Sequence, residues 1–181
     1  MQESRSVYVR PVKKEDMKSF YKAAQDEEIR YMTGTRHVFT MDQLYEHYER
    51  IIQDETRFDF AICLRDNDEL LGDLSIVEID RENQKAGFRI ALHSRGHLNK
   101  GYGTEAVRLA LKFAFETLKL NRLQLEVFSH NSRALRAYEK AGFKREGIIR
   151  QSLFLNNQYS DEIIMGMLKK EYEELKKHDV I

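Results

Sequence analysis

Two glycines in one short segment form the first group of residues whose types and spacing could do chemistry. A strand-like apolar run over residues 86–92 precedes Gly101 and Gly103, and a largely apolar helix pattern follows from Thr104. Free N–H groups at a helix N-terminus bind anions, most often phosphate, and glycine lets the backbone approach such a ligand closely. The segment therefore predicts an anion site, and a tight turn without a ligand remains the alternative.

The spacing of these residues excludes two well-known phosphate motifs. Gly96 and Gly101 are separated as in a P-loop, but Tyr102 and Gly103 occupy the positions of Lys and Ser or Thr. A dinucleotide-binding fingerprint would need a third glycine at Ala106. This segment alone therefore does not identify the phosphate ligand.

A second segment narrows the choice. After a β-rich run over residues 123–128, the residues Asn131 and Ser132 begin a helix pattern that carries Tyr138 and ends near Gly142. Together, KGYGTEA and NSRALRAYEKAGF resemble the two sequence blocks of the GNAT superfamily of acetyl-CoA-dependent N-acetyltransferases, in the same order and at a similar separation. Within that family, the resemblance is strongest to the ribosomal-protein N-terminal acetyltransferases and the polyamine acetyltransferases.

This resemblance implies a fold and a cofactor. It implies a mixed α/β GNAT fold in a single domain over residues 1–181, with helices on both faces of a mostly antiparallel twisted sheet. The sheet would have about seven strands and one parallel pair joined by a right-handed helical crossover. The implied cofactor is acetyl-CoA, with no metal. The residues expected to bind it are Ile90, Leu92, Leu98, Asn99, Lys100, Gly101, Tyr102, Gly103, Thr104, Asn131, Ser132 and Tyr138.

One position departs from the family pattern. The residue three before the first loop glycine, often Gln or Arg in the family, is Leu98, with Arg95 and Lys100 nearby. Which side chain supports the loop N–H groups therefore stays open.

Periodicity and turn residues predict the remaining elements. The capping-box residues Thr40 and Gln43 begin one helix, and Asn156-Asn157 predicts a hairpin turn. The expected strands are 6–12, 58–64, 70–79, 85–92, 123–128, 144–155 and 158–168. The expected helices, besides the two above, are 14–25, 26–32, 40–54 and 169–177.

Composition limits the partners and the compartment. The 181 residues carry 30 Lys and Arg against 30 Asp and Glu, so no net field favours nucleic acid or membrane. The N-terminal residues lack the apolar core of a signal peptide, and no apolar run is long enough to span a bilayer. The single cysteine, Cys63, cannot form an internal disulfide and reads as a small buried side chain. We therefore expect a cytoplasmic protein, with a homodimer as one arrangement.

Tyr138 is the candidate general acid. A phenol is protonated at neutral pH and can give its proton to a departing thiolate. Tyr138 follows Asn131 by two helical turns, so both face the same side. Without the family resemblance, the simpler reading is a core tyrosine whose hydroxyl bonds to the backbone; the resemblance favours the acid.

Two further roles follow from the resemblance. Asn131 either caps its helix or binds the pantetheine amide, and Ser132 competes for the capping role. A bulge at the end of the strand 88–92 would aim backbone N–H groups of Ile90 and Leu92 at the acetyl carbonyl.

The general base has several candidates. Glu78 and Glu126 lie on strands near the expected cleft, as does Asp80, and a solvated strand carboxylate is the simpler reading for each. His93 follows the strand 85–92 and needs only a small pKa shift to act near neutral pH. A chain of water molecules could also remove the proton, leaving no single base.

Three functions remain open. The first is acetyl transfer to a protein or peptide N-terminal α-amine in a ternary complex, favoured by the segments EGIIR and NQYSD of residues 146–150 and 157–161. The alternative is acetylation of a polyamine such as spermidine or spermine. The carboxylates of residues 26–28, with Glu78 and Asp80, could bind the cations if the fold brings them together. The third is a module that binds CoA without catalysis.

Overall fold

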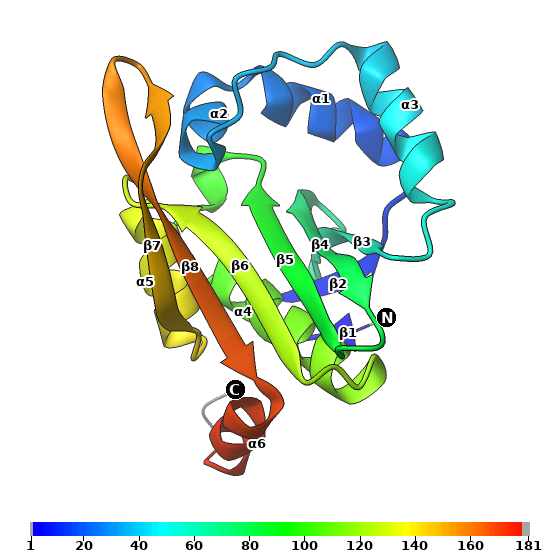
Figure 1. The fold of residues 1–181 in the computed structure, drawn as a ribbon. Coiled ribbons are helices and arrows are strands. Elements are labelled where there is room, and N and C mark those ends of the chain that lie inside the picture. The colour runs from blue at the N-terminus through cyan, green and yellow to red at the C-terminus, as the bar shows by residue number, and fades with distance from the viewer. Residues whose placement is uncertain (1, 179–181) are drawn as a thin grey trace.

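The computed structural model describes residues 2–178 and is organised around one eight-stranded sheet (Figure 1). The strand order is β1-β2-β3-β4-β5-β6-β8-β7. Only β5 and β6 are parallel neighbours; the other neighbouring strands are antiparallel. The strands are β1 (Gln2–Glu3), β2 (Val7–Pro11), β3 (Phe58–Leu64), β4 (Leu70–Asp80), β5 (Lys85–Leu92), β6 (Arg122–Phe128), β7 (Lys144–Leu155) and β8 (Gln158–Leu168). The expected fold class is confirmed, and the two-residue β1 is the strand that the sequence patterns did not predict.

The helices agree closely with the sequence-based expectations. They are α1 (Met17–Gln25), α2 (Glu27–Thr33), α3 (Met41–Ile51), α4 (Tyr102–Lys112), α5 (Ser132–Lys140) and α6 (Lys169–Lys177). Helix α4 begins at Tyr102, earlier than Thr104, because Gly101 adopts the left-handed conformation that starts the helix. Three short helical turns complete the set: η1 (Lys14–Asp16), η2 (Arg95–His97) and the π-helical η3 (Phe113–Thr117).

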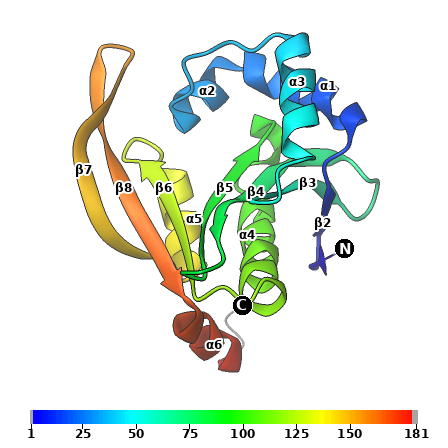
Figure 2. The same cartoon turned by 45° about the vertical axis from the view of Figure 1, so that its right-hand side comes forward.

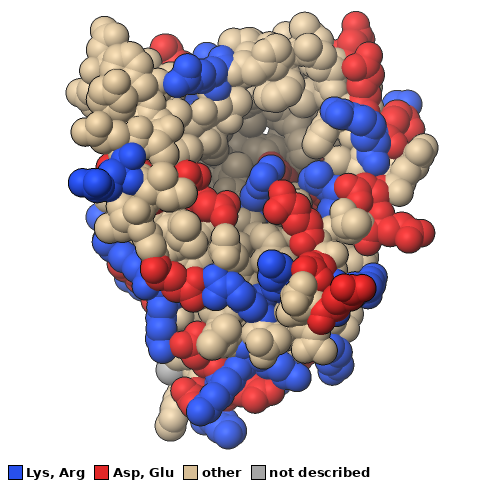
Figure 3. Space-filling model, viewed as in Figure 1, with Lys and Arg blue, Asp and Glu red and all other residues tan. Residues whose placement is uncertain are grey.

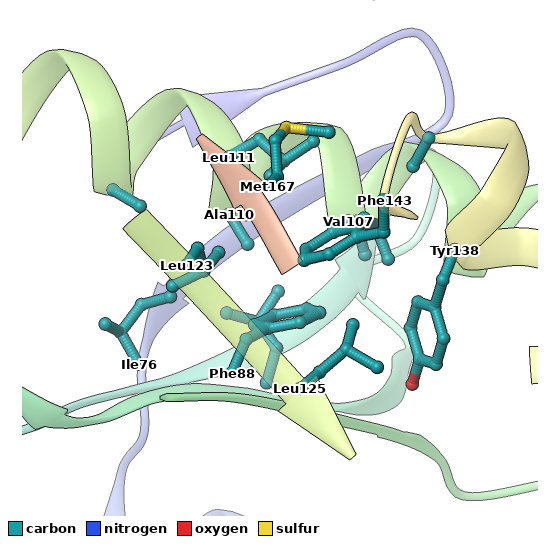
Figure 4. Close-up of a cluster of buried hydrophobic side chains, with 14 of the residues drawn as sticks. Ile76, Phe88, Val107, Ala110, Leu111, Leu123, Leu125, Tyr138, Phe143 and Met167 are labelled. Atoms are coloured by element: carbon teal, nitrogen blue, oxygen red, sulfur yellow. The ribbon is translucent and has the colours of Figure 1, made fainter. Parts of the chain in front are cut away.

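The main core lies between the sheet and helices α4 and α5. Phe88 of β5 and Leu123 of β6 pack with Val107 and Leu111 of α4 (Figure 4). Helices α1, α2 and α3 form a separate layer above the end of the sheet to which β5 points (Figures 1 and 2). No helix within residues 2–178 combines the length and the apolar character needed to cross a bilayer.

The parallel strands β5 and β6 pair over only one end of their length. Lys85, Ala86 and Gly87 of β5 pair with residues 122–124 of β6, and the ladder stops there. Beyond that point β6 keeps its pairing with β8 through Phe128. The two strands therefore separate toward their carboxyl ends, next to helix α2 (Figure 1).

The C-terminal hairpin extends beyond the rest of the sheet (Figure 1). Asn156 and Asn157 both have positive φ, 52° and 58°, which confirms the predicted turn. Helix α6 then returns to the core and buries Tyr172, so this helix is not only a solvated charged face.

Candidate functional site

A cavity lies where β5 and β6 separate. Its volume is about 420 Å³. Its walls come from helix α2, the end of β5, the loop from Ser94 into helix α4, and helix α5. The expected coenzyme-binding residues that line it are Ile90, Leu92, Leu98, Asn99, Gly101, Tyr102, Gly103, Thr104, Asn131 and Tyr138. Lys100 and Ser132 do not line this cavity, and both are exposed.

The first turn of helix α4 presents free backbone donors to the cavity. Gly101 is its N-cap, with φ 85°, and no side chain caps the helix. The first N–H groups of a helix have no intrahelical partner, and here they carry the positive end of the helix dipole. Gly101 is needed for its left-handed backbone, whereas Gly103 has ordinary dihedral angles and only Leu92 near the position of an added Cβ, at 3.8 Å.

Helix α5 adds positive charge that the sequence analysis missed. Arg133, Arg136 and Lys140 all line the cavity. Within residues 2–178 none of the three forms an ion pair, so their charge is not neutralised internally. Their spacing of three and seven residues, which places them on one helix face, was the signal that could have found them.

The edge of β5 that faces the gap carries the backbone groups of Ile90 and Leu92. The amide of His93 donates to the carbonyl of Leu71 on β4, over 2.8 Å. Bonded pairs alternate along an antiparallel ladder, so Ala91 also faces β4, while Ile90 and Leu92 face the side that β6 has left.

The prediction of a β-bulge in this part of β5 is wrong. The ladder between β4 and β5 is regular from Gly87 to Leu92, and its register shift lies instead between Val77 and Asp80 of β4. The separation of β6, rather than a bulge, exposes the backbone groups of β5. A local sequence pattern does not report where two strands stop pairing, because that depends on the packing beneath them.

Tyr138 lies at the rim of the buried cluster with its hydroxyl directed away from Phe143 (Figure 4). Its side chain is 8% exposed and lines the cavity. The hydroxyl makes no hydrogen bond within residues 2–178, unlike that of a core tyrosine bonded to the backbone. Burial raises the pKa of Tyr138 above the ordinary value for a phenol, so the hydroxyl stays protonated at neutral and mildly alkaline pH.

Asn131 holds two elements together. Its side-chain oxygen accepts from the amide of Ala134, over 3.2 Å, and so caps helix α5, as one of the two readings of this residue expected. Its side-chain nitrogen donates to the carbonyl of Met32 at the end of helix α2, over 3.1 Å. The neighbouring His130 donates from Nε2 to the carbonyl of Tyr31, over 2.8 Å. These bonds fix the α2 wall of the cavity, a role that the sequence did not reveal.

The two strand carboxylates considered as bases lie outside the cavity lining. Glu78 is exposed, at the register shift of β4, with φ 53°. Glu126 is exposed on β6, where its side chain accepts from Gln124 over 2.9 Å. The structure does not bring these two residues together with Tyr138 in the cavity wall.

A polar cluster of residues from β3, β4 and the segments next to β3 and β5 lies beside helix α1, whose Ser19 and Phe20 contact His93. It consists of Arg57, Asp59, Asp73, Ser75 and His93. Asp59 accepts twice from the guanidinium of Arg57, over 2.6 and 2.7 Å, and once from Ser75, over 2.6 Å. Asp73 accepts over 2.6 Å from Nε2 of His93. The face of the molecule seen in Figure 3 is hollowed, with acidic and basic side chains around the hollow.

A surface ion pair joins helix α2 to the loop before α4. The guanidinium of Arg95 lies 2.8 Å from the carboxylate of Glu28, and both residues line the cavity. Arg95 is 63% exposed, so this pair contributes little to stability. Of the acidic residues 26–28, only Glu28 therefore lines the cavity, and it is already paired with a cation.

Comparison with known proteins agrees with this geometry. Residues 6–144 match the family described as the acetyltransferase (GNAT) domain. The spermidine N(1)-acetyltransferase of Escherichia coli (strain K12) is 28% identical over 173 residues, 95% of this chain and 91% of that protein. A ribosomal N-acetyltransferase-like protein of Bacillus subtilis (strain 168), YdaF, is 35% identical over 106 residues, 58% of this chain and 56% of that protein.

A solved structure shows the same fold. The spermidine N-acetyltransferase of Vibrio cholerae, in complex with CoA and spermine, superposes with a TM-score of 0.87 at 25% identity. The match covers 92% of this chain and 98% of that one. Both branches expected from the sequence are thus among the relatives. The family match over most of the chain, the splayed strands and the glycine corner at α4 show that the chain belongs to the GNAT acetyltransferase family and is an N-acetyltransferase.

Proposed function

We propose that this enzyme transfers the acetyl group of acetyl-CoA to a primary amine of a polyamine. One observation carries the proposal: a single cavity contains the uncapped N-terminus of α4, the cations of α5 and Tyr138. These are the groups needed to hold a polyphosphate and to protonate a thiolate.

The cavity suits coenzyme A. Free N–H groups of Tyr102, Gly103 and Thr104 would bind the diphosphate, assisted by Arg133 and Arg136. Bound there, acetyl-CoA supplies an activated acetyl thioester. The pantetheine arm would follow the edge of β5, where backbone groups of Ile90 and Leu92 are free to bind an extended chain.

The residues around the gap then divide the chemistry. The N–H groups of Ile90 and Leu92 would stabilise negative charge on the acetyl oxygen. Tyr138 would give its proton to the departing sulfur, since burial keeps the phenol protonated. Asn131 would act indirectly, by capping α5 and by fixing α2 through Met32.

A polyamine is the acceptor that the relatives favour. The E. coli and V. cholerae relatives are spermidine acetyltransferases matched over more than nine-tenths of this chain, whereas the ribosomal N-acetyltransferase-like relative aligns over 58%. The preference for an N-terminal α-amine, expected first from residues 146–161, therefore gives way to the polyamine alternative. The acidic side chains among the charged residues around the hollow in Figure 3 would attract a polycation.

The experiment supplies purified protein with acetyl-CoA and follows release of free thiol. Spermidine and spermine form one arm, and short peptides with free N-termini form the other. We expect thiol release and a singly acetylated polyamine by mass spectrometry. Release with the peptides alone would restore the N-terminal acceptor, and tight CoA binding without release in either arm would indicate a binding module.

A further inference from the structure

Asp73 is the one carboxylate of the polar cluster with an unused oxygen. Oδ1 of Asp73 accepts from His93, and no hydrogen bond or ion pair within residues 2–178 reaches Oδ2. Its side chain is 30% exposed, so solvent or a ligand can reach it. Asp59, by contrast, is held by the guanidinium of Arg57 and by Ser75. Only Asp73 is therefore free to bind an added cation in this cluster.

Asp73 does not itself line the cavity, but the register of the sheet places it one strand away from Ala91, which does. Asp73 is the direct cross-strand partner of Ala91, which lies between Ile90 and Leu92. Partners in a bonded antiparallel pair have Cα atoms about 5.5 Å apart. The carboxylate thus lies one strand away from the backbone groups proposed to hold the acetyl oxygen, on the same face of the sheet as the side chain of Ala91.

His93 holds this carboxylate in place. Its side chain is 7% exposed and packs edge-on against Phe20 of helix α1, with ring centroids 4.8 Å apart. Nδ1 of His93 lies 3.4 Å from the hydroxyl of Ser19. When this hydroxyl donates to Nδ1, the ring proton is on Nε2, which donates it to Asp73. A buried histidine bonded on both sides fixes the rotamer of the aspartate.

We propose that Asp73, positioned by His93, binds the attacking amine of the acceptor and takes its proton. This inference rests on the proposed acetyl transfer and names the base that the sequence left open. His93 is then a positioning residue, which acts on the amine only through Asp73. Glu78 and Glu126 are the candidate bases from the sequence. Neither residue is a cross-strand partner of Ala91 or of its neighbours Ile90 and Leu92.

Acetyl transfer through Asp73 and Tyr138 moves each proton between named groups. An alkylammonium gives one proton to Oδ2 of Asp73, and the freed lone pair attacks the acetyl carbon. The N–C bond forms as the C–S bond breaks, and the sulfur receives the phenolic proton of Tyr138. The nitrogen releases its second proton to solvent, solvent reprotonates Tyr138, and Asp73 loses its proton to complete the cycle.

The test compares Asp73→Asn, Asp73→Glu and wild type with spermidine and acetyl-CoA. We expect Asp73→Asn to lower kcat/KM for spermidine by about 10²–10³-fold, in the range for a lost general base, while Asp73→Glu recovers part of the rate. The CoA dissociation constant and the thermal unfolding midpoint should stay at wild-type values, because Asn can still accept from His93. Glu82→Gln, in the exposed turn after β4, removes a charge of the same sign and serves as the control.

The positioning role has its own readout. His93→Phe keeps an aromatic ring against Phe20 but removes the donor to Asp73, so we expect kcat to fall by about 10²-fold without a change in CoA affinity. His93→Gln retains an N–H donor and should restore most of that loss. A merely structural histidine would show equal losses in both variants together with a lower unfolding midpoint.

The outcomes separate this inference from the proposed function. Wild-type turnover of spermidine with an unaltered rate in Asp73→Asn overturns the role of Asp73 alone, and a large loss in Glu78→Gln or Glu126→Gln instead would move the base there. Absence of polyamine turnover in the wild type overturns the proposed acceptor. The same variants are then compared on the peptide α-amine, where an unchanged rate in Asp73→Asn would again refute the base.

Discussion

Individual residues of the cavity have distinct and separable duties. Tyr138 has a buried ring, a free hydroxyl and a raised pKa, all of which suit a proton donor. Gly101 and Gly103 lie in the same loop but are needed for different reasons. Gly101 adopts a left-handed backbone conformation, and Gly103 leaves space beside the backbone. Each duty therefore has its own substitution.

Replacing Tyr138 with phenylalanine removes only the hydroxyl. We expect kcat to fall by roughly 10²-fold, the lower range for a lost proton donor, because the thiolate must then leave unprotonated. The ring packing against Phe88 and Phe143 is retained, so CoA affinity and thermal stability should not change. An unaltered kcat in stopped-flow or steady-state assays would remove the acid role.

The two loop glycines give a matched pair. Gly103→Ala places a methyl group in open space, 3.8 Å from Leu92, so the free protein should fold normally while CoA affinity falls because the methyl group obstructs the diphosphate. Gly101→Ala forces a non-glycine residue into φ 85°, at a cost of about 1 kcal/mol or more in stability. Calorimetric titration with CoA and thermal melts distinguish the two effects. Full CoA affinity in Gly103→Ala would contradict close phosphate contact.

Elements rather than single residues determine the shape of the cavity. Strand β5 supplies free backbone groups because β6 leaves it after Gly87, and helix α4 supplies an uncapped N-terminus beside that gap. Helix α5 brings cations to the same place, and α2 closes the wall through bonds from His130 and Asn131. The site depends on four elements that meet only in the folded chain.

The contribution of helix α5 can be measured through its charge. Arg136→Ala should weaken CoA binding about tenfold, the order of one hydrogen bond to a charged group, and the loss should shrink as salt rises. Arg108→Ala on the exposed face of α4 is the control for removal of a positive charge. Equal CoA affinity in both variants at low salt would exclude α5 from phosphate binding.

Stability of the whole molecule should fall in acid through its buried carboxylates. Asp16 is 7% exposed. Burial raises the pKa of Asp16, but hydrogen bonds from Arg10 and from the amide of Lys13 outweigh burial and lower the pKa below its usual value. A carboxyl group whose pKa is lowered by folding stabilises the folded protein. This contribution is complete above the ordinary carboxyl pKa of about 4, and it is lost as the pH falls through the pKa of the folded state.

The Asp16→Asn variant tests this linkage. Loss of the carboxylate leaves Arg10 unpaired and should cost about 3 kcal/mol in unfolding free energy near neutral pH. Below pH ~4 the difference from wild type should shrink, because the wild type protonates Asp16 there. Urea denaturation at several pH values measures both trends, and a constant difference across pH would contradict them.

Self-association remains a prediction for the whole molecule. The β7–β8 hairpin exposes Ile148, Ile149, Phe154 and Tyr159, with Tyr159 at 62% exposure. Light scattering at assay concentration would show whether the chain is a homodimer, and a monomer would contradict that expectation.

The sequence by itself determined most of the elements and the position of the glycine turn before α4. Strand β3 lies where the pattern of residues 58–64 predicts it, and the hairpin turn lies at the Asn-Asn pair. Both signals come from residues that are neighbours in the sequence. The glycine corner and Tyr138 were found in the same way, from residues close together in the chain. Glu78 and Glu126 were chosen as bases because each is a carboxylate on a strand, a property that does not specify which face of the sheet meets the cavity.

The tertiary structure decided which distant residues meet. Asp73 and His93 are twenty positions apart in the sequence, and the register of β4 and β5 brings their side chains together. Helix α1 then packs against His93 and buries it. The separation of β5 from β6 after Gly87 likewise follows from which residues of the two strands pair, and no local pattern in either strand specifies that. Register and packing are properties of the whole chain, which is why the pairing of Asp73 with His93 is visible only in the folded molecule.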